Sequence, residues 1–158
     1  IIMNNKMDDV LKDIMKAYMA QMDSAVKISE IIYNHSGNDE LTGDDIICGL
    51  VYRLMVPMTQ EEIRESLKKA DELMNEEDSG EEEDLDKEED LDEEEEVYER
   101  EEENKILRKI KTNTCNCDIC SKVRVCLLNF KDHEPSDTLA QRFKDSIQLV
   151  CDEHKIYI

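Results

Sequence analysis

Apolar residues recur at three- and four-residue intervals through the first third of the chain. The pattern runs from Met7 to Ile32, and no Gly or Pro interrupts it. This spacing predicts one long amphipathic helix over residues 4–34. The apolar stripe is rich in methionine, whose flexible side chain adapts to a partner surface. We therefore expect another polypeptide to cover the stripe; the alternative is a helical hairpin in which the chain packs on itself.

Two further helices are predicted by capping motifs. Polar residues and Gly37 end the long helix, and Thr42 followed by Asp45 opens a second helix that ends at Pro57. The same motif, Thr59 with its partner three residues on, opens a third helix over residues 60–74. The residues expected to bind a partner are the apolar positions of the first two helices: Met7, Leu11, Ile14, Met15, Tyr18, Met22, Val26, Ile46, Leu50 and Leu54.

Residues 75–104 make the chain acidic. This segment holds 20 of the 41 Asp and Glu residues but only 2 of the 20 Lys and Arg residues. Like charges at helical spacing repel, and little apolar surface is available for burial, so we expect a disordered acidic linker. Its end, near residues 94–110, mixes charges and could be helical. The linker alternatively serves as a tail that binds a basic partner protein.

The C-terminal part, residues 105–158, returns to amphipathic patterns. Ile106, Leu107 and Ile110 suggest a short helix, whereas residues 122–130 fit a strand or a helix. Ser136 or Asp137 would then cap a final helix. The expected fold is therefore mainly α, with three parts: helical residues 1–74, the acidic linker 75–104 and a small Cys-rich module, 105–158.

The cysteines of the C-terminal part have metal-ligand spacing. Cys115, Cys117 and Cys120 form a C-x-C-x2-C cluster, and Cys151 and His154 follow about thirty residues later. Cysteine and histidine are the ligands that tetrahedral zinc prefers, so these five residues are candidate zinc ligands. Cys126 and His133 could substitute for some of them. The alternatives are reduced thiols buried in a small helical unit, and a redox-active pair.

No catalytic constellation is visible. The chain has no Gly-rich phosphate loop and no nucleophile in a recognised frame, and it contains only three histidines. Three Cys ligands and one His ligand would fill all four positions of a zinc ion and leave none for a substrate. We therefore expect a non-enzymatic binding protein. No signal-peptide pattern opens the chain and no apolar run approaches the roughly 18 residues of a membrane span, so we expect an intracellular location.

The order of elements in the N-terminal part resembles a core histone from its central helix onward. Residues 2–7 match the start of the central helix, and residues 33–34 match its end. Residues 41–46, with the pattern Leu-Thr-x-x-Asp-Ile, match the loop and the start of the next helix. Residues 54–57 and the helix after them resemble the additional C-terminal helix of one histone type.

This resemblance implies a histone-fold region that heterodimerises with a histone-like partner, in chromatin, genome packaging or transcription. The loop of residues 35–40 has no Lys or Arg. Histones bind phosphate through basic residues there, so direct DNA contact is not expected.

A second resemblance covers the C-terminal part. The pattern CNCDIC, NFKDHEPSD and LAQRFKDSI is similar to the C-terminal segment of uncharacterised proteins of large double-stranded DNA viruses. Together the two resemblances imply a viral histone-fold protein located in the nucleus, the viral factory or the virion. The alternative function is a virion structural or interaction protein with a zinc-stapled C-terminal module.

Overall fold

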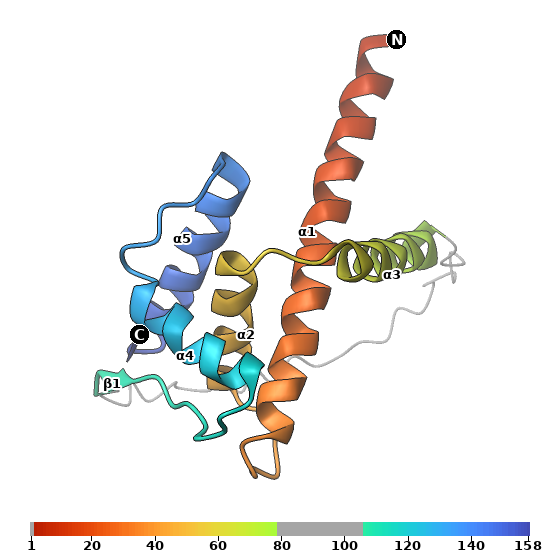
Figure 1. The fold of residues 1–158 in the computed structure, drawn as a ribbon. Helices are drawn as coiled ribbons and strands as arrows, with labels where there is room; N and C mark the ends of the chain where they lie inside the picture. The colour runs from red at the N-terminus through yellow and green to blue at the C-terminus, as the bar shows by residue number, and fades with distance from the viewer. Residues whose placement is uncertain (1, 79–105) are drawn as a thin grey trace, which may run out of the picture.

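The computed structural model describes residues 2–78 and 106–158, and within them the chain is mainly helical (Figure 1). The expectation of a mainly α fold is confirmed. The elements are α1 (Ile2–Asn34), α2 (Gly43–Met55), α3 (Gln60–Asp78), β1 (Arg108–Lys109), α4 (Asp118–Asn129), α5 (Thr138–Glu153) and β2 (Ile156–Tyr157).

The first three helices begin within two residues of the predicted starts, and α3 continues to Asp78, four residues beyond its predicted end. Helix α1 is continuous for 33 residues. At the start of α2, the Thr42 hydroxyl accepts from the Asp45 backbone, and the Asp45 carboxylate accepts from the Thr42 backbone. Thr59 and Glu62 exchange the same two hydrogen bonds before α3. These reciprocal caps satisfy N–H groups that have no partner inside a helix.

Helix α2 lies at the centre of the molecule. It packs against α1 on one side and against α4 and α5 on the other (Figure 1). Most of its residues are buried, including Cys48, Val51 and Tyr52. One core therefore contains side chains from both the N-terminal and the C-terminal parts, such as Ile32 of α1 and Phe130 after α4.

Gly49 sets how closely α1 and α2 approach. A Cβ at this position would overlap the Ser29 hydroxyl and would lie 2.5 Å from the Ala25 carbonyl oxygen. The Ser29 hydroxyl itself donates to that same carbonyl, 2.9 Å away. Backbone atoms therefore meet at this crossing with no room for a side chain.

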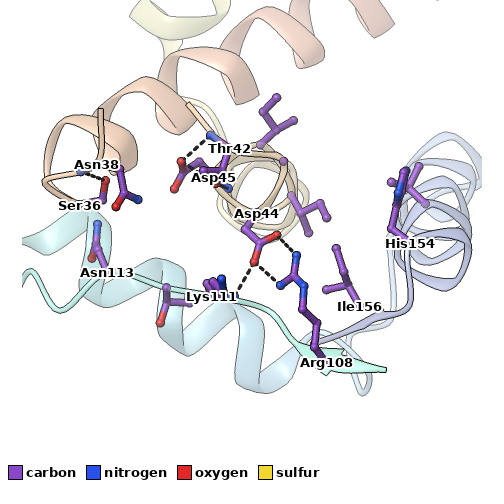
Figure 2. Close-up of a pocket in the computed structure, with 15 residues that line it drawn as sticks. Ser36, Asn38, Thr42, Asp44, Asp45, Arg108, Lys111, Asn113, His154 and Ile156 are labelled. Carbon is purple, nitrogen blue, oxygen red and sulfur yellow. Dashed lines mark hydrogen bonds and ion pairs between the residues drawn. The ribbon is translucent and has the colours of Figure 1, made fainter. Parts of the chain in front are cut away.

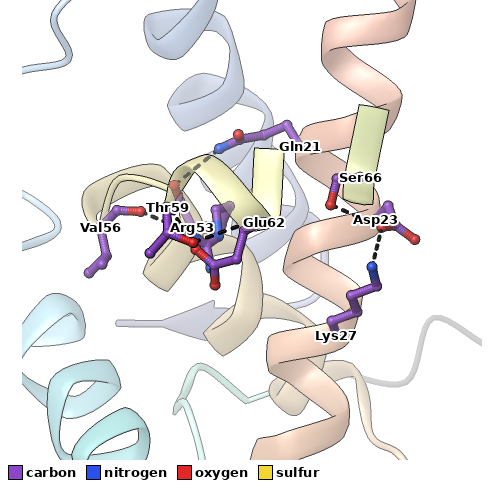
Figure 3. Close-up of polar contacts among 8 residues, drawn as sticks. All are labelled: Gln21, Asp23, Lys27, Arg53, Val56, Thr59, Glu62 and Ser66. Carbon is purple, nitrogen blue, oxygen red and sulfur yellow. Dashed lines mark hydrogen bonds and ion pairs between the residues drawn. The ribbon is translucent and has the colours of Figure 1, made fainter. Parts of the chain in front are cut away.

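Helix α3 crosses α1 and is fixed by polar contacts (Figure 3). The Ser66 hydroxyl donates to the Asp23 carboxylate of α1. Arg53, whose side chain is almost fully buried, forms an ion pair with Glu62 at 3.3 Å. Gln21 of α1 donates to the Arg53 carbonyl, so the end of α2 is bound to both neighbouring helices.

The C-terminal part differs from prediction at its start. The short helix expected around residues 106–110 is wrong: Arg108 and Lys109 form strand β1, which pairs in parallel with β2. The reason is a set of long-range hydrogen bonds, since the backbone N–H groups of Arg108 and Ile110 donate to carbonyls at residues 155 and 157. Residues 122–130, compatible with strand or helix, are mostly in α4. Helix α5 starts after its predicted cap, Asp137.

Asp44 binds the C-terminal part to α2 (Figure 2). Both oxygens of this buried carboxylate accept from the Arg108 guanidinium at 2.8 Å, and one also accepts from the Lys111 backbone. The hydrogen bond from Arg108 is the largest influence on this carboxyl, and the pKa of Asp44 is held below its ordinary value even though burial opposes the shift.

The predicted acidic linker begins inside a helix and continues outside the described residues. Residues 75–78 belong to α3, whereas 79–105 are not described, so disorder there stays a prediction, as does a helix near 94–105. Among the described helices, none has the length and apolar character to span a membrane.

We predict that Gly49→Ala destabilises the protein by about 1–3 kcal/mol, the usual cost of overpacking. The added methyl group would push α1 and α2 apart at backbone atoms that cannot rotate away. Urea unfolding followed by circular dichroism measures the loss. Gly43→Ala is the control: no atom lies within 4 Å of its added Cβ, so its effect should stay within about 0.5 kcal/mol. Equal effects for the two variants would contradict the packing argument.

We predict that Arg108→Ala lowers stability at neutral pH by about 1–3 kcal/mol, because Asp44 would lose its charged donor while staying buried. A lowered carboxyl pKa stabilises the fold above the ordinary carboxyl pKa of about 4, and this contribution disappears as the pH falls through the lowered value. The stability difference between wild type and variant should therefore shrink in acid. Denaturant titrations at pH 7 and pH 3 measure it. Arg142→Ala, at an exposed site of α5, should show little change at either pH.

Candidate metal centre

Four side chains from distant parts of the sequence meet at one end of the molecule. They are His35, directly after α1, and Cys115, Cys117 and Cys120, around the start of α4. Their ligand atoms all lie within 4.8 Å of one another. Cys120 is buried, Cys115 and Cys117 are partly exposed, and His35 is exposed.

The distances fit tetrahedral coordination. His35 Nδ1 lies 3.5 Å from Cys115 Sγ, 3.3 Å from Cys117 Sγ and 3.5 Å from Cys120 Sγ. Zinc bonds of about 2.3 Å to sulfur and 2.0–2.1 Å to nitrogen, at tetrahedral angles, put the nitrogen about 3.5 Å from each sulfur. These three nitrogen–sulfur distances would therefore change little if an ion bound between the four atoms.

The cysteine loop is braced by its own backbone and by two polar side chains. Asn113 bridges the two halves of the site: its amide donates to the Ile32 carbonyl of α1 and to Cys120 Sγ. The Arg124 guanidinium donates to the Cys115 carbonyl at 2.7 Å and to the Asn113 carbonyl at 3.0 Å. Such supporting contacts fix the ligand side chains in position before a metal binds.

The thiols differ in acidity. The pKa of Cys117 is lowered to about 6, mainly because its sulfur accepts a hydrogen bond from the Cys120 backbone N–H; the neighbouring thiols and His35 add to this effect. The pKa of Cys120 is raised to about 11, mainly because this thiol is buried. The lowered pKa favours the thiolate form of Cys117, the form that binds metal, and an incoming cation would have to displace the proton of Cys120.

This group could hold a metal ion. Three sulfurs and one imidazole nitrogen are soft donors, the set found in structural zinc sites. An ion bound by all four would have no position left for a substrate or water. It would also link the end of α1 to the start of α4 and so stabilise the packing of the C-terminal part.

The structure assembles three of the five candidate ligands. Cys115, Cys117 and Cys120 come together as expected, but Cys151 and His154 lie outside the group, and His35 occupies the fourth position instead. Cys151 is almost fully buried in the core, because the last turn of α5 packs beside α2. His154 caps the end of α5 and lines the same pocket as Asp44 (Figure 2).

The two possible substitutes also lie elsewhere. Cys126 is buried in the core, where desolvation raises its pKa. The backbone carbonyl of His133 accepts from the Lys144 ammonium, and its ring is not in the group. His35 was missed because it precedes the cysteines by 80 residues or more. Its place immediately after a long helix, as one of only three histidines, was the available signal.

The predicted partner-binding residues divide into two sets. Those still exposed are Met7, Leu11, Ile14, Met15, Met22, Val26 and Ile46. Tyr18, Leu50 and Leu54 are instead partly buried against the core. Tyr18 also contacts the Phe143 ring of α5, with centroids 6.0 Å apart.

Comparison of the chain with models of protein families, with curated proteins and with solved structures found no match in any of the three.

We predict that the protein binds one zinc per chain, and that His35→Ala weakens zinc affinity by at least about 100-fold, since even loss of a supporting hydrogen bond to a ligand costs about 10–100-fold. Competition with a chromophoric chelator measures the affinity. Cobalt in place of zinc should give the absorption of a tetrahedral thiolate site, and this signal should weaken in the same variant.

His154→Ala is the matched control for the zinc experiment, because this second histidine lies outside the group. Its zinc affinity should equal that of the wild type. Retained affinity in His35→Ala together with lost affinity in His154→Ala would restore the ligand set expected from sequence and exclude the geometry described above.

Proposed function

We propose that this chain is a non-enzymatic protein-interaction subunit. One face of α1 binds another helical polypeptide, and a zinc ion bound by His35 and the three clustered cysteines holds the C-terminal part in place. Non-enzymatic character is supported by the ligand set, which would fill a tetrahedral ion completely.

The observation that carries the proposal is the apolar surface of the N-terminal half of α1. We call residues 5–16 the arm; it extends beyond the other described helices in Figure 1. Five apolar side chains of the arm are 44–71% exposed: Met7, Val10, Leu11, Ile14 and Met15. Further along α1 the same face, at Ile28 and Ile32, is buried in the core.

Exposure of this kind has a cost that a partner would remove. Large contiguous apolar patches on soluble proteins usually mark interaction sites. Burying an exposed Leu or Met side chain is worth about 1.5–3 kcal/mol. The arm would gain this stabilisation only when a second polypeptide covers it, since within the described chain those side chains face solvent.

A narrower proposal concerns the setting. The order of a long helix, a short loop, a capped helix, a proline and a third helix supports a histone-like partner in chromatin, genome packaging or transcription. The corresponding location is the nucleus, a viral factory or a virion. The acidic segment would then bind basic partner proteins, and direct DNA contact is not proposed.

The second candidate is a virion structural or interaction protein with a zinc-stapled C-terminal module. It is favoured by the composition of the ligand group, in which three of the four residues belong to the C-terminal part. An ion bound there would couple metal binding to the folding of that part.

The test is the solution mass of the zinc-loaded full chain, alone and mixed with purified core histones as the probe. We expect the wild type to form a complex in at least one of the two conditions. Both measurements are made at high salt, which screens binding of histones to the acidic segment. Leu11→Asp/Ile14→Asp should then stay a single chain in both, because two charges would interrupt the exposed apolar face. Sedimentation velocity separates these outcomes.

The control adds the same charge outside α1. Lys131→Glu lowers the net charge by two, as the test variant does, but changes an exposed polar position that follows α4. It should associate like the wild type. A wild type that is a well-dispersed single chain in both conditions, or a test variant that associates normally, would contradict the proposal.

A further inference from the structure

An apolar groove opens where the arm enters the body of the molecule. It has a volume of about 390 Å³ and is lined by α1, by the α2–α3 region and by the start of α5. Tyr18, Leu54 and Met58 form one part of the lining, and Leu139 and Phe143 form another. The arm and the groove are continuous along α1, because the arm ends at Lys16 and the groove begins at the next residue, Ala17.

We propose that the arm and groove together bind a second copy of this chain. The two α1 helices pair antiparallel, and each arm reaches the groove of the other copy. This inference rests on the proposed function above, because it names the partner that covers the same face of α1.

The spacing of apolar residues supports an antiparallel pairing. Met7, Leu11, Ile14 and Tyr18 follow intervals of four, three and four residues, which is the a and d pattern of paired helices. A register centred between Leu11 and Ile14 puts each of them opposite the other in the second copy. The same register puts Met7 opposite Tyr18 of the other copy, at the edge of the groove.

Charge also fits a second copy. The whole chain has a net charge of −21, but the arm is neutral, with three basic and three acidic residues. These are Lys6, Lys12, Lys16, Asp8, Asp9 and Asp13. Two arms therefore meet without net repulsion, whereas a surface built for a strongly basic partner would be acidic.

The available apolar area is of the order that a dimer interface buries. The exposed apolar side chains of the arm form a patch on the order of 500 Å², near the upper end of what single soluble chains expose. A stable interface buries about 800 Å² on each partner. The arm does not reach this area alone, and the lining of the adjoining groove adds to the surface that each copy can bury.

Self-complementarity favours a second copy over an unrelated protein. The arm is a convex apolar helix without a cover, and the groove is a concave apolar surface without an occupant among the described residues. One chain offers both, side by side. Two-fold pairing satisfies both surfaces of both copies and closes the assembly at two chains.

The experiment uses two zinc-loaded full-length variants that each damage one surface. Met7→Asp/Val10→Asp places charges on the arm. Leu139→Asp/Ala140→Glu places charges in the groove, in the first turn of α5, where acidic residues favour the helix. Each variant alone should self-associate roughly tenfold or more weakly than the wild type, because both reciprocal contacts are damaged.

Mixing the two variants should restore association in part. A mixed pair keeps one intact arm and one intact groove facing each other, so native mass spectrometry should find two-chain complexes that contain one copy of each variant. Lys131→Glu, which lowers the net charge by two at an exposed position outside both the arm and the groove, should dimerise like the wild type. The cobalt absorption of each variant shows that the fold is retained.

Three outcomes would overturn this inference. They are a wild type that stays a single chain without histones, a groove variant that dimerises normally, and a mixture that forms no mixed pair. The first outcome would leave the proposed function intact and replace only the partner if core histones bind the wild type but not the arm variant. Loss of both self-association and histone binding would refute both.

Discussion

Helix α2 can pack closely against α1 and also contact α4 and α5 because residue 49 has no side chain. The contact of Gly49 with Ala25 and Ser29 brings two helix backbones together, which leaves the remaining faces of α2 free to receive α4 and α5. In this way a small chain with few aromatic residues buries more apolar surface, since α2 is buried on almost every side. Asp44 then fixes the strand pair against the start of the same helix. The orientation of the metal ligands follows from this arrangement, because it brings the end of α1 and the start of α4 to the same end of α2.

Local signals were sufficient for most helices and failed for contacts between distant residues. Periodicity and capping pairs such as Thr42 with Asp45 predicted α1, α2, α3 and α5, because caps and apolar faces are properties of short segments. Helix α4 was ambiguous, since a short run of apolar and β-branched residues fits either regular structure. The strand pair could not be foreseen from the sequence. Arg108 and Lys109 pair with Ile156 and Tyr157 only because the chain returns to this place nearly fifty residues later.

The candidate site shows the same division. The spacing of Cys115, Cys117 and Cys120 is local, so the sequence alone indicated a metal-binding loop. The fourth ligand was assigned to the C-terminal end by analogy with paired ligand motifs, but α5 turns Cys151 into the core. His35 has no sequence neighbour that marks it as a ligand, and only the packing of α1 against α4 brings it to the cysteines.

The separation of the ligands also sets an order of events during protein synthesis. His35 leaves the ribosome long before Cys120, because 84 residues lie between them. Synthesis proceeds from the N-terminus, so α1, α2 and α3 emerge while the site still lacks all its sulfur ligands. An ion can be enclosed by all four ligands only after Cys120 has been made. A bound ion would therefore distinguish chains that extend past this residue, since a chain that terminates earlier would lack at least one sulfur ligand.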